Sequence, residues 1–179
     1  MNSELIIRTA NTDDAESLLS YIMAFQKENC RTVPKLDFIP SLDQEKEWIQ
    51  SRTGNRGVTI IAQYSEKVVG LIETSLNKSS EFKHNCEFGM SVLQKYRNMG
   101  IGRKLLIEFI KWTEAQELMR IELNVFSNNL PAISLYKNFG FVEDGRREKA
   151  VKLSNDNFCD LIHMFKWIHQ DNSFLEEIR

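Results

Sequence analysis

The chain has 179 residues, of which 42% are hydrophobic, and its formal net charge is −2. A chain of this length and composition can bury a core without disulfides or a structural metal. The near-neutral charge argues against nucleic-acid binding through a basic surface. We therefore expect one domain over residues 1–179, with a core at about residues 5–166 and a C-terminal tail at 167–179.

The cysteines indicate the compartment. Cys30, Cys86 and Cys159 are an odd number at wide spacing, without a CxxC motif, which is typical of reduced thiols in a cytoplasmic protein. The histidines add no metal-ligand spacing, so we expect no metal site. The first residues lack the basic segment and apolar run of a signal peptide, and no apolar run reaches about 18 residues. A membrane partner is therefore not expected.

The N-terminal part begins with a short predicted strand at residues 5–8. Thr12 is placed to cap a helix whose first turn carries Asp13 and Asp14, next to the positive end of the helix dipole. The helical period also predicts an apolar stripe, which consists of Ala15, Leu18, Leu19, Ile22 and Phe25.

A second helix follows an irregular loop. Residues 30–40 contain two prolines and read as the loop. Ser41 and Gln44 then form a capping-box pattern. Trp48 and Ile49 lie on the apolar side of the helix that this box begins. Trp48 could line an acceptor pocket together with Phe38 of the loop, and core packing is the equal alternative.

Three strands and a strong helix come next. Residues 58–64 and 67–76 predict a hairpin, and residues 86–93 predict a third strand. Gly100 and Gly102 then open a helix with one apolar face. That face consists of Leu105, Leu106, Phe109, Ile110 and Thr113.

The C-terminal part starts with a strand at residues 120–125. Pro131 fits the first turn of a short helix that Gly140 ends. The apolar face of this helix consists of Ala132, Leu135, Tyr136 and Phe139. Two final strands are predicted at 141–153 and 158–165, so the chain alternates strands and helices in the manner of an α/β (α+β) domain.

The most informative segment is residues 92–103, where a strand runs through a glycine loop into a helix N-terminus. Free N–H groups and the helix dipole favour an anion there, and glycine lets the backbone approach a pyrophosphate closely. A Walker A loop is excluded because Arg103 follows Gly102. A dinucleotide-binding fingerprint is excluded because Leu105 stands where a small residue is required.

Two motifs carry a resemblance to a known family. Residues 97–102 resemble the R/Q-x-x-G-x-G/A pyrophosphate loop of GNAT acetyltransferases, and residues 129–141 resemble their N-x-x-A-x-x-L-Y-x-x-x-G-F segment. The resemblance extends over about residues 5–166. It implies a single-domain GNAT fold with a mixed, mostly antiparallel central sheet flanked by about four helices. It also implies acetyl-CoA as the acetyl donor.

By the same resemblance, one strand and the glycine loop hold the donor through backbone groups. The N–H of Met90 is the expected donor to the thioester oxygen. Asn129 reads as a polar contact to the donor, as a helix cap, or as both. The donor-binding residues implied are Met90, Ser91, Val92, Arg97, Asn98, Met99, Gly100, Ile101, Gly102, Arg103, Asn129 and Tyr136.

An acceptor amine must lose a proton before it attacks, and carboxylates are the candidate bases. Glu87 is the first candidate, because some amino-acid-acetylating members carry a glutamate at this offset. Glu73 on the neighbouring strand is the second, and a water chain stays open. Asn124 stands where ribosomal-protein-alanine acetyltransferases carry a glutamate base, and an amide cannot take the proton. We expect Glu73, Glu87 and Asn124 to contact the acceptor.

The departing thiolate is expected to receive a proton from Tyr136. On pattern alone Tyr136 would be a core residue, and the family motif favours the catalytic role. Cys86 lies beside Glu87 but has no recognisable His-Asp or His-Asn pair, so we interpret it as a core residue rather than a nucleophile.

The expected reaction is direct attack of a primary amine on acetyl-CoA. Residues 86–92 resemble the corresponding strand of amino-acid and phosphinothricin-type acetyltransferases, which favours a small metabolite or a peptide as the acceptor. An amino acid would need a cation for its carboxylate, for which Arg146 or Arg147 is the candidate. A polyamine acetyltransferase, a GNAT-fold module that binds acyl-CoA without turnover, a longer acyl donor and a homodimer remain open alternatives.

Overall fold

The computed structural model describes residues 4–28, 38–52, 56–77, 79–154 and 156–168. Cys30, most of the predicted loop and most of the tail lie outside these residues. Within them the strands are β1 (Leu5–Thr9), β2 (Gly57–Tyr64), β3 (Lys67–Leu76), β4 (Asn85–Val92), β5 (Arg120–Phe126), β6 (Val142–Ser154) and β7 (Asn157–Trp167). The α-helices are α1 (Ala15–Lys27), α2 (Leu42–Ser51), α3 (Ile101–Ala115) and α4 (Leu130–Asn138).

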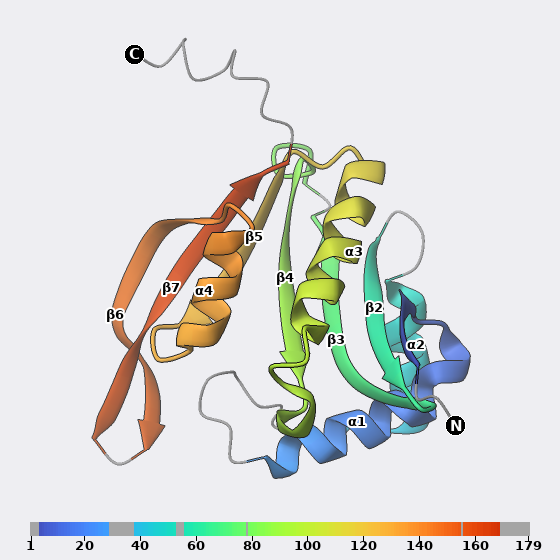
Figure 1. Ribbon diagram of the computed structural model, residues 1–179. Coiled ribbons are helices and arrows are strands. Elements are labelled where there is room, and N and C mark those ends of the chain that lie inside the picture. The colour runs from blue at the N-terminus through green and yellow to red at the C-terminus, as the bar shows by residue number, and fades with distance from the viewer. Residues whose placement is uncertain (1–3, 29–37, 53–55, 78, 155, 169–179) are drawn as a thin grey trace.

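The strands form one seven-stranded sheet in the order β1-β2-β3-β4-β5-β7-β6 (Figure 1). Neighbours pair antiparallel except β4 and β5, which are parallel. Four helices flank the sheet, so the predicted mixed, mostly antiparallel architecture is confirmed.

Two apolar cores lie on opposite faces of the sheet, because side chains alternate along each strand. On β2, Ile60 belongs to the core that also contains Phe109 of α3 and Tyr136 of α4. Its neighbour Ile61 belongs to the second core, with Leu18 of α1. Helices α3 and α4 therefore cover one face, and α1 and α2 cover the other.

The first helix begins differently from the prediction. Asn11, not Thr12, caps the 3-10 turn η1 (Thr12–Asp14) that leads into α1, because its side chain accepts from the Asp13 N–H at 2.8 Å. In return the Asp14 carboxylate accepts from the Asn11 N–H at 2.9 Å. Arg8 of β1 holds that carboxylate with two hydrogen bonds of 2.6 and 2.7 Å, which places Asp14 where it can complete the box.

The other predicted elements are confirmed with small shifts at their ends. The Ser41–Gln44 capping box is present in both directions. The turn between β2 and β3 places Ser65 and Glu66 at φ 46° and 67°, as a tight two-residue hairpin requires. Within the described residues no helix combines the length and the apolar character needed to cross a membrane.

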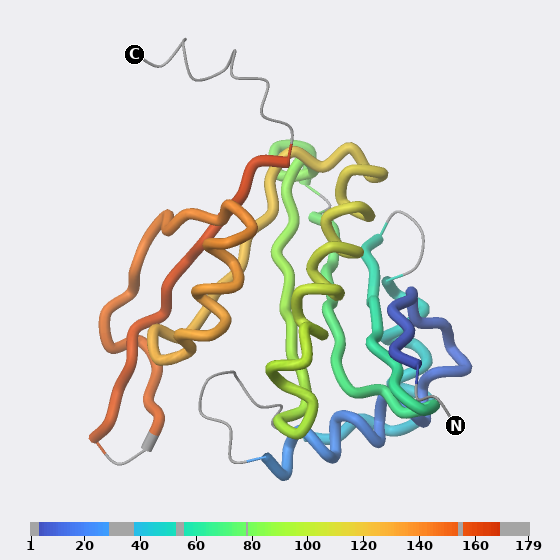
Figure 2. The backbone as a smooth tube through the Cα atoms, in the orientation of Figure 1, coloured from blue at the N-terminus to red at the C-terminus, as the bar shows by residue number. Residues whose placement is uncertain are grey.

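The sheet opens between β4 and β5. The two strands pair only from Asn85 with Arg120 to Glu87 with Glu122, and past this point they diverge. Figures 1 and 2 show them adjacent at one end of the sheet and apart at the other, where the N-terminus of α3 lies beside the end of β4. This divergence leaves one edge of β4 without a strand partner and creates the site.

Candidate active site

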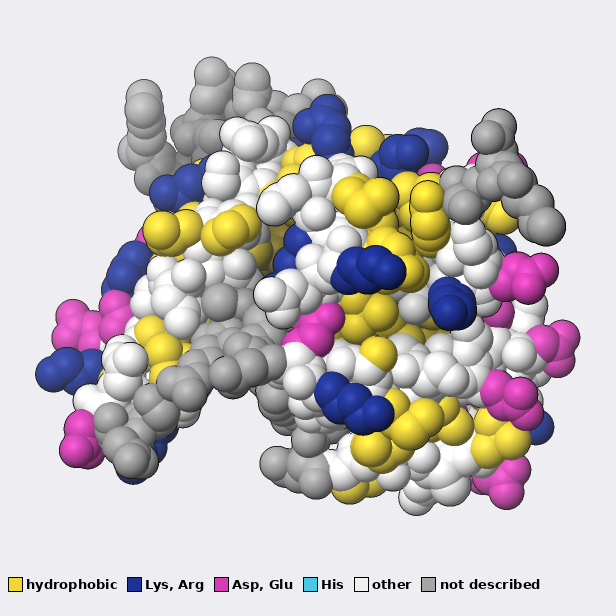
Figure 3. Space-filling model, turned by 60° about the horizontal axis from the view of Figure 1, so that its bottom comes forward, with side chains coloured by type: hydrophobic (Ala, Val, Ile, Leu, Met, Phe, Trp, Pro, Cys, Tyr) yellow, Lys and Arg dark blue, Asp and Glu magenta, His cyan; other side chains and the backbone are white. Residues whose placement is uncertain are grey.

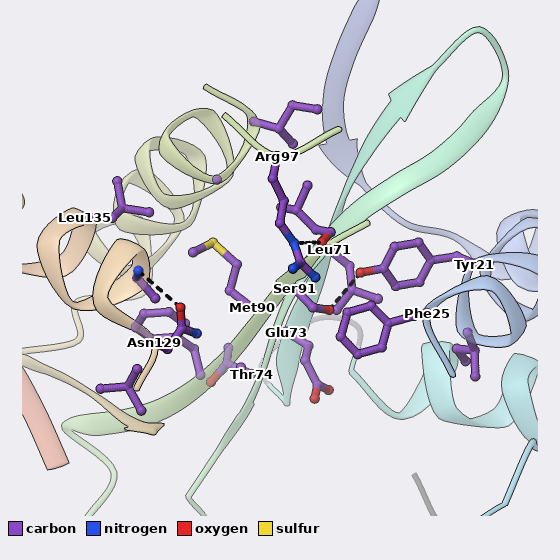
Figure 4. A pocket seen from close by; sticks show the side chains of 18 of the residues that line it. Tyr21, Phe25, Leu71, Glu73, Thr74, Met90, Ser91, Arg97, Asn129 and Leu135 are labelled. Carbon is purple, nitrogen blue, oxygen red and sulfur yellow. Dashed lines mark hydrogen bonds between the residues drawn. The ribbon is translucent and has the colours of Figure 1, made fainter. Parts of the chain in front are cut away.

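A cavity of about 1110 Å³ occupies the opening between β4 and β5. Residues of α1, α2, β3, β4, the start of α3, β5 and α4 line it. Figure 3 shows this side of the molecule, where hydrophobic side chains gather together with basic and acidic ones. In Figure 4, Met90 and Asn129 lie on one side of the cavity, and Glu73, Tyr21 and Phe25 lie on the other.

The α3 end of the cavity is built to receive an anion. Gly100 caps the helix at φ 75°, a left-handed conformation that glycine adopts without strain. Asn98 is also left-handed, at φ 62°. A Cβ at Gly100 would meet no atom within 4 Å, so the backbone there faces open space. The first helical hydrogen bond runs from Lys104 to Gly100, which leaves the preceding N–H groups without intrahelical partners.

Gly102 serves a different purpose in the same loop. A Cβ there would lie 3.4 Å from the Leu135 side chain of α4. The missing side chain therefore lets α3 and α4 approach each other beside the cavity.

The edge of β4 presents backbone groups to the cavity. The N–H of Leu93 donates to the Val69 carbonyl of β3 at 2.9 Å. Donor direction alternates along a strand, so the N–H groups of Met90 and Val92 point away from β3, toward the open edge. This geometry is the one that a backbone donor to a thioester oxygen requires.

Arg97 joins the loop to α1. Its Nε donates to the Val92 carbonyl at 2.9 Å, and its NH2 group donates to the Glu28 carboxylate at 3.0 Å. Glu28 also accepts from the Gln94 N–H at 2.5 Å. Arg97 was predicted to bind the donor. It lines the cavity, and its hydrogen bonds also stabilise the loop.

Tyr136 lies at the bottom of the cavity on α4 and is 5% exposed. Its ring packs against Phe88 and Phe141, with centroid distances of 5.9 and 5.7 Å. Burial raises the pKa of the Tyr136 hydroxyl above its usual range, so the phenol stays protonated. Tyr136 is therefore both a core residue and part of the cavity lining.

Asn129 caps α4 through the Ala132 N–H at 3.4 Å, and it also lines the cavity. The predicted cap is therefore present, and the contact with the donor stays a prediction that this position allows. The short helix begins at the residue after this cap and ends before Gly140, which is left-handed at φ 83°.

Glu87 and Asn124 meet where β4 and β5 separate. The Asn124 side-chain amide donates to Glu87 Oε1 at 2.6 Å. Both side chains are exposed, and both line the cavity. The amide that replaces the glutamate of other family members thus holds a glutamate from the neighbouring strand.

Glu73 lies deeper than Glu87. It pairs with Gly89 across β3 and β4, and its Oε1 is 3.6 Å from the position of a Cβ at Gly89. The absence of a side chain at Gly89 therefore leaves the Glu73 carboxylate against β4, one residue from the Met90 amide. Burial raises the pKa of the Glu73 carboxyl, and the charge of Arg52 partly opposes this effect.

Arg52, at the C-terminal end of α2, completes this side of the cavity. Its Nε lies 3.3 Å from Glu73 Oε2, and its guanidinium carbon lies 4.1 Å from the centroid of the Trp48 ring. Glu45, about two turns earlier on α2, lines the same cavity and is 3% exposed. Burial raises the pKa of the Glu45 carboxyl, against the opposing charge of Arg52.

The prediction missed Arg52, Glu45 and Tyr21. A signal for the first two was present, because Glu45 and Arg52 lie three and four residues from Trp48 and recur on the helix face that this tryptophan marks. Tyr21 gave no such signal. Its hydroxyl shares a 2.8 Å hydrogen bond with the Ser91 hydroxyl of β4, which fastens α1 beside the cavity.

All of the predicted donor-binding and acceptor-contacting residues line this one cavity except Met99. It is 52% exposed and is not part of the lining. Arg146 and Arg147 do not line the cavity either. Arg146 instead pairs with Glu143 and Asp160, each at 3.0 Å, along the hairpin of β6 and β7.

Other expected lining residues are present. Trp48 and Phe38 both contribute to the cavity wall. Cys86 is buried and faces the core, and burial raises the pKa of its thiol to about 12, which does not suit a nucleophile. Among the described residues Cys86 and Cys159 are free cysteines. No cluster of potential metal ligands occurs in the described part of the chain.

Known proteins resemble this chain in sequence and in structure. The L-amino acid N-acetyltransferase AaaT of Escherichia coli (strain K12) is 32% identical over 165 residues, covering 90% of this chain and 97% of that protein. The spermine/spermidine N(1)-acetyltransferase of Bacillus subtilis (strain 168) is 40% identical over 53 residues, covering 29% of this chain and 35% of that protein. The crystal structure of an acetyltransferase of the GNAT family from Streptococcus pneumoniae has a TM-score of 0.86 and 26% identity, covering 92% of this chain and 99% of that one.

The sequence also matches a known protein family over most of its length. Residues 22–141 match the Acetyltransferase (GNAT) family. This span contains the glycine loop, the open edge of β4 and helix α4 with Tyr136. The prediction made from the two motifs is confirmed: the chain belongs to the GNAT family of acetyltransferases and is an N-acetyltransferase.

Proposed function

We propose that this enzyme transfers the acetyl group of acetyl-CoA to the amino group of a free L-amino acid with an apolar side chain. The observation that carries the proposal is that one cavity joins the N-terminus of α3 to a side with the half-buried carboxylate of Glu73 and an arginine. The similarity to an L-amino acid N-acetyltransferase over nearly the whole of both chains supports the same acceptor class.

Acetyl-CoA supplies the thioester carbonyl that the amine attacks and the thiolate that leaves. The free N–H groups at the start of α3 are suited to the pyrophosphate, and the open edge of β4 is suited to the pantetheine arm. The Met90 N–H would donate to the thioester oxygen and stabilise the negative charge that develops there. The chain's residues therefore fit the donor along its length.

On the acceptor side we assign the ammonium and its proton to Glu73 in preference to Glu87. Glu73 is half-buried and lies against β4 at Gly89, next to Met90, and burial raises its pKa, which suits a group that takes a proton from the acceptor. Glu87 is exposed, and one of its oxygens already accepts from Asn124. We therefore assign Glu87 to the cavity lining, together with Asn124.

Tyr136 is assigned as the acid that protonates the departing thiolate. Burial keeps its hydroxyl protonated over the whole working pH range and also makes it a weaker acid than a free phenol, so the hydrogen bond to the developing thiolate supplies much of the stabilisation. Packing of the ring against Phe88 and Phe141 holds it in one place in the cavity wall. A buried phenol of this kind can also donate a hydrogen bond to the sulfur before the proton moves.

A polyamine is the second candidate acceptor. Glu45, Glu73 and Glu87 line one cavity, and a polyamine needs at least two carboxylates for its separated ammonium groups. The segment of 53 residues shared with a spermine/spermidine acetyltransferase supports this reading over a short stretch. Arg52 weighs against it, because a cation beside Glu73 neutralises that carboxylate and repels a second ammonium.

An assay of CoA release separates the two. The purified enzyme is given acetyl-CoA with apolar L-amino acids, their D-enantiomers, spermidine or an alanine-terminated peptide, and the acetylated products are identified by mass. We expect the highest kcat/KM with an apolar L-amino acid. A higher kcat/KM with spermidine than with every amino acid would show that a polyamine is the preferred acceptor.

A further inference from the structure

We propose that Arg52 binds the carboxylate of the acceptor while Glu73 holds its ammonium, so that the Arg52–Glu73 ion pair is the receptor for the zwitterionic end of an amino acid. This inference rests on the proposed function, because it assumes an amino-acid acceptor. It replaces the cation that the sequence suggested on β6 with one on α2.

Helix α2 and the Trp48 ring hold the Arg52 guanidinium at the cavity wall. Arg52 is the C-cap of α2, and the guanidinium lies over Trp48 at 4.1 Å from the ring centroid. Only 19% of its side chain is exposed. Stacking on an aromatic face fixes the plane of the guanidinium, which is the arrangement that favours planar recognition of a carboxylate.

The contact between Arg52 and Glu73 is loose. The Nε atom lies 3.3 Å from Glu73 Oε2, yet this buried nitrogen makes no hydrogen bond. The Arg52 NH1 group donates a long hydrogen bond of 3.4 Å to the Ser51 hydroxyl. An acceptor carboxylate can therefore gain well-aligned charged hydrogen bonds from Arg52 without breaking strong ones.

The chemistry of the acceptor matches the spacing of this pair. In an α-amino acid a single carbon separates the ammonium from the carboxylate, so the two charges require partners that lie next to each other. Arg52 and Glu73 are such neighbours, with opposite charges, in one wall of the cavity. A polyamine would meet only the carboxylate favourably.

Arg52 is the arginine with the right location among those that line the cavity in the described part of the chain. Arg97 is engaged by the Val92 carbonyl and by Glu28, at the end where the donor would bind. Arg103 lies over the Phe139 ring at 5.3 Å, on the side of α3 and α4. Neither is placed to meet an acceptor that approaches Glu73.

Apolar side chains surround the pair on the acceptor side of the cavity. They come from α1, α2, β3 and the segment before α2, and they are Tyr21, Phe25, Phe38, Trp48 and Leu71. This wall can desolvate the pair when an acceptor binds, which strengthens charged hydrogen bonds. It also provides the contact surface for an apolar side chain of the amino acid.

The test compares L-phenylalanine with L-phenylalaninamide, which keeps the amine and the ring but lacks the negative charge. Steady-state kcat/KM is measured for both acceptors in the wild type and in Arg52→Gln. We expect the wild type to prefer the acid. Arg52→Gln is expected to lower the acid-to-amide ratio by about 10- to 100-fold, because the loss is larger for the acid than for the amide.

Two further variants complete the design. Arg147→Gln makes the same chemical change at an exposed residue outside the cavity, and we expect it to keep the wild-type ratio. Arg52→Lys keeps the charge but loses the planar fork, and we expect an intermediate ratio. Melting temperatures of all variants are measured, and Arg52→Lys carries the test if Arg52→Gln does not fold.

The outcomes are distinct. Equal losses toward acid and amide in the Arg52 variants would show that Arg52 only positions Glu73, and would overturn this inference while leaving the proposed function intact. A large fall of the acid-to-amide ratio in Arg147→Gln would indicate that the carboxylate binds at β6, and would also overturn the inference about Arg52. A wild type that acetylates spermidine but neither acceptor would instead refute the proposed function itself.

Discussion

The Oε1 atom of Glu73 lies 3.6 Å from the place where Gly89 would carry a Cβ atom. Glu73 and Gly89 are direct partners across β3 and β4, so the register of this pair places the carboxylate over Gly89, the residue before Met90. The glycine leaves a gap beside the carboxylate, and this gap is where we propose that the acceptor amine binds.

Gly89→Ala tests this relationship. A contact of 3.6 Å is ordinary van der Waals contact, so we expect the fold and the melting temperature to be retained. The added methyl group partly fills the gap, and we expect kcat/KM for the acceptor to fall by about 10- to 100-fold, as small misplacements at a reacting centre do. Gly145→Ala on β6, where a Cβ meets nothing within 4 Å, is the control. A variant as active as the wild type would place the acceptor elsewhere.

Glu73→Gln and Glu87→Gln separate the two candidate bases. Glutamine keeps the shape but cannot take the proton, so we expect Glu73→Gln to lower kcat/KM by about 100-fold or more and Glu87→Gln to lower it by less than about 10-fold. A base must be deprotonated to work, and the pKa of Glu73 is raised. The acidic limb of the wild-type pH profile should therefore lie above the usual carboxyl pKa of about 4.3 and disappear in Glu73→Gln. The reverse order of losses would return the base to Glu87.

Tyr136→Phe tests the proposed acid. The packing against Phe88 and Phe141 is preserved, so the melting temperature should change little. We expect kcat to fall by about 10- to 1,000-fold with a smaller change in the KM for acetyl-CoA. Because burial raises the pKa of Tyr136, its ionisation should cause no loss of wild-type activity up to about pH 10. Tyr64→Phe on β2, outside the cavity lining, is the control, and equal kcat values in both variants would remove Tyr136 from the mechanism.

Gly100→Ala tests the anion site at α3. Alanine at φ 75° costs about 1 kcal/mol or more of stability, and its Cβ projects into the open space that a pyrophosphate would occupy. We expect acetyl-CoA to bind at least about 10-fold more weakly in calorimetry. Gly140→Ala meets the same left-handed strain at φ 83° outside the cavity and should lose stability alone. Equal affinities in the two variants would contradict the loop assignment.

Asp14→Asn tests the first turn rather than the active site. The pKa of Asp14 is lowered, chiefly by the hydrogen bonds from Arg8. Its contribution to stability should be present above the usual pKa near 3.8 and should vanish as pH falls through the lower folded value. We expect the variant to lose about 1–3 kcal/mol in urea denaturation at pH 7. Asp13→Asn, an exposed change in the same turn, should cost less than about 0.5 kcal/mol, and the difference between the variants should shrink in acid.

The sequence alone determined the features that depend on neighbouring residues. The capping box of Ser41 and Gln44, the glycine loop at 97–102 and the helix between Asn129 and Gly140 are local, because each needs only a few consecutive backbone angles and hydrogen bonds. The family motifs fall on these local features. The mixed, mostly antiparallel sheet was predicted from the resemblance to the family, and its strand order came only from the structure.

The misplaced cap at Thr12 marks the limit of local reasoning. Thr12 and Asn11 are both good caps, and the choice was made by Arg8, which reaches from β1 to hold Asp14. The acceptor side of the active site shows the same limit at larger range. Arg52 ends a helix, Glu73 lies in the middle of a strand, and Gly89 faces it from the next strand. Only strand register and helix packing bring these three together, because the charge, the gap and the aromatic wall come from segments that no short sequence pattern connects.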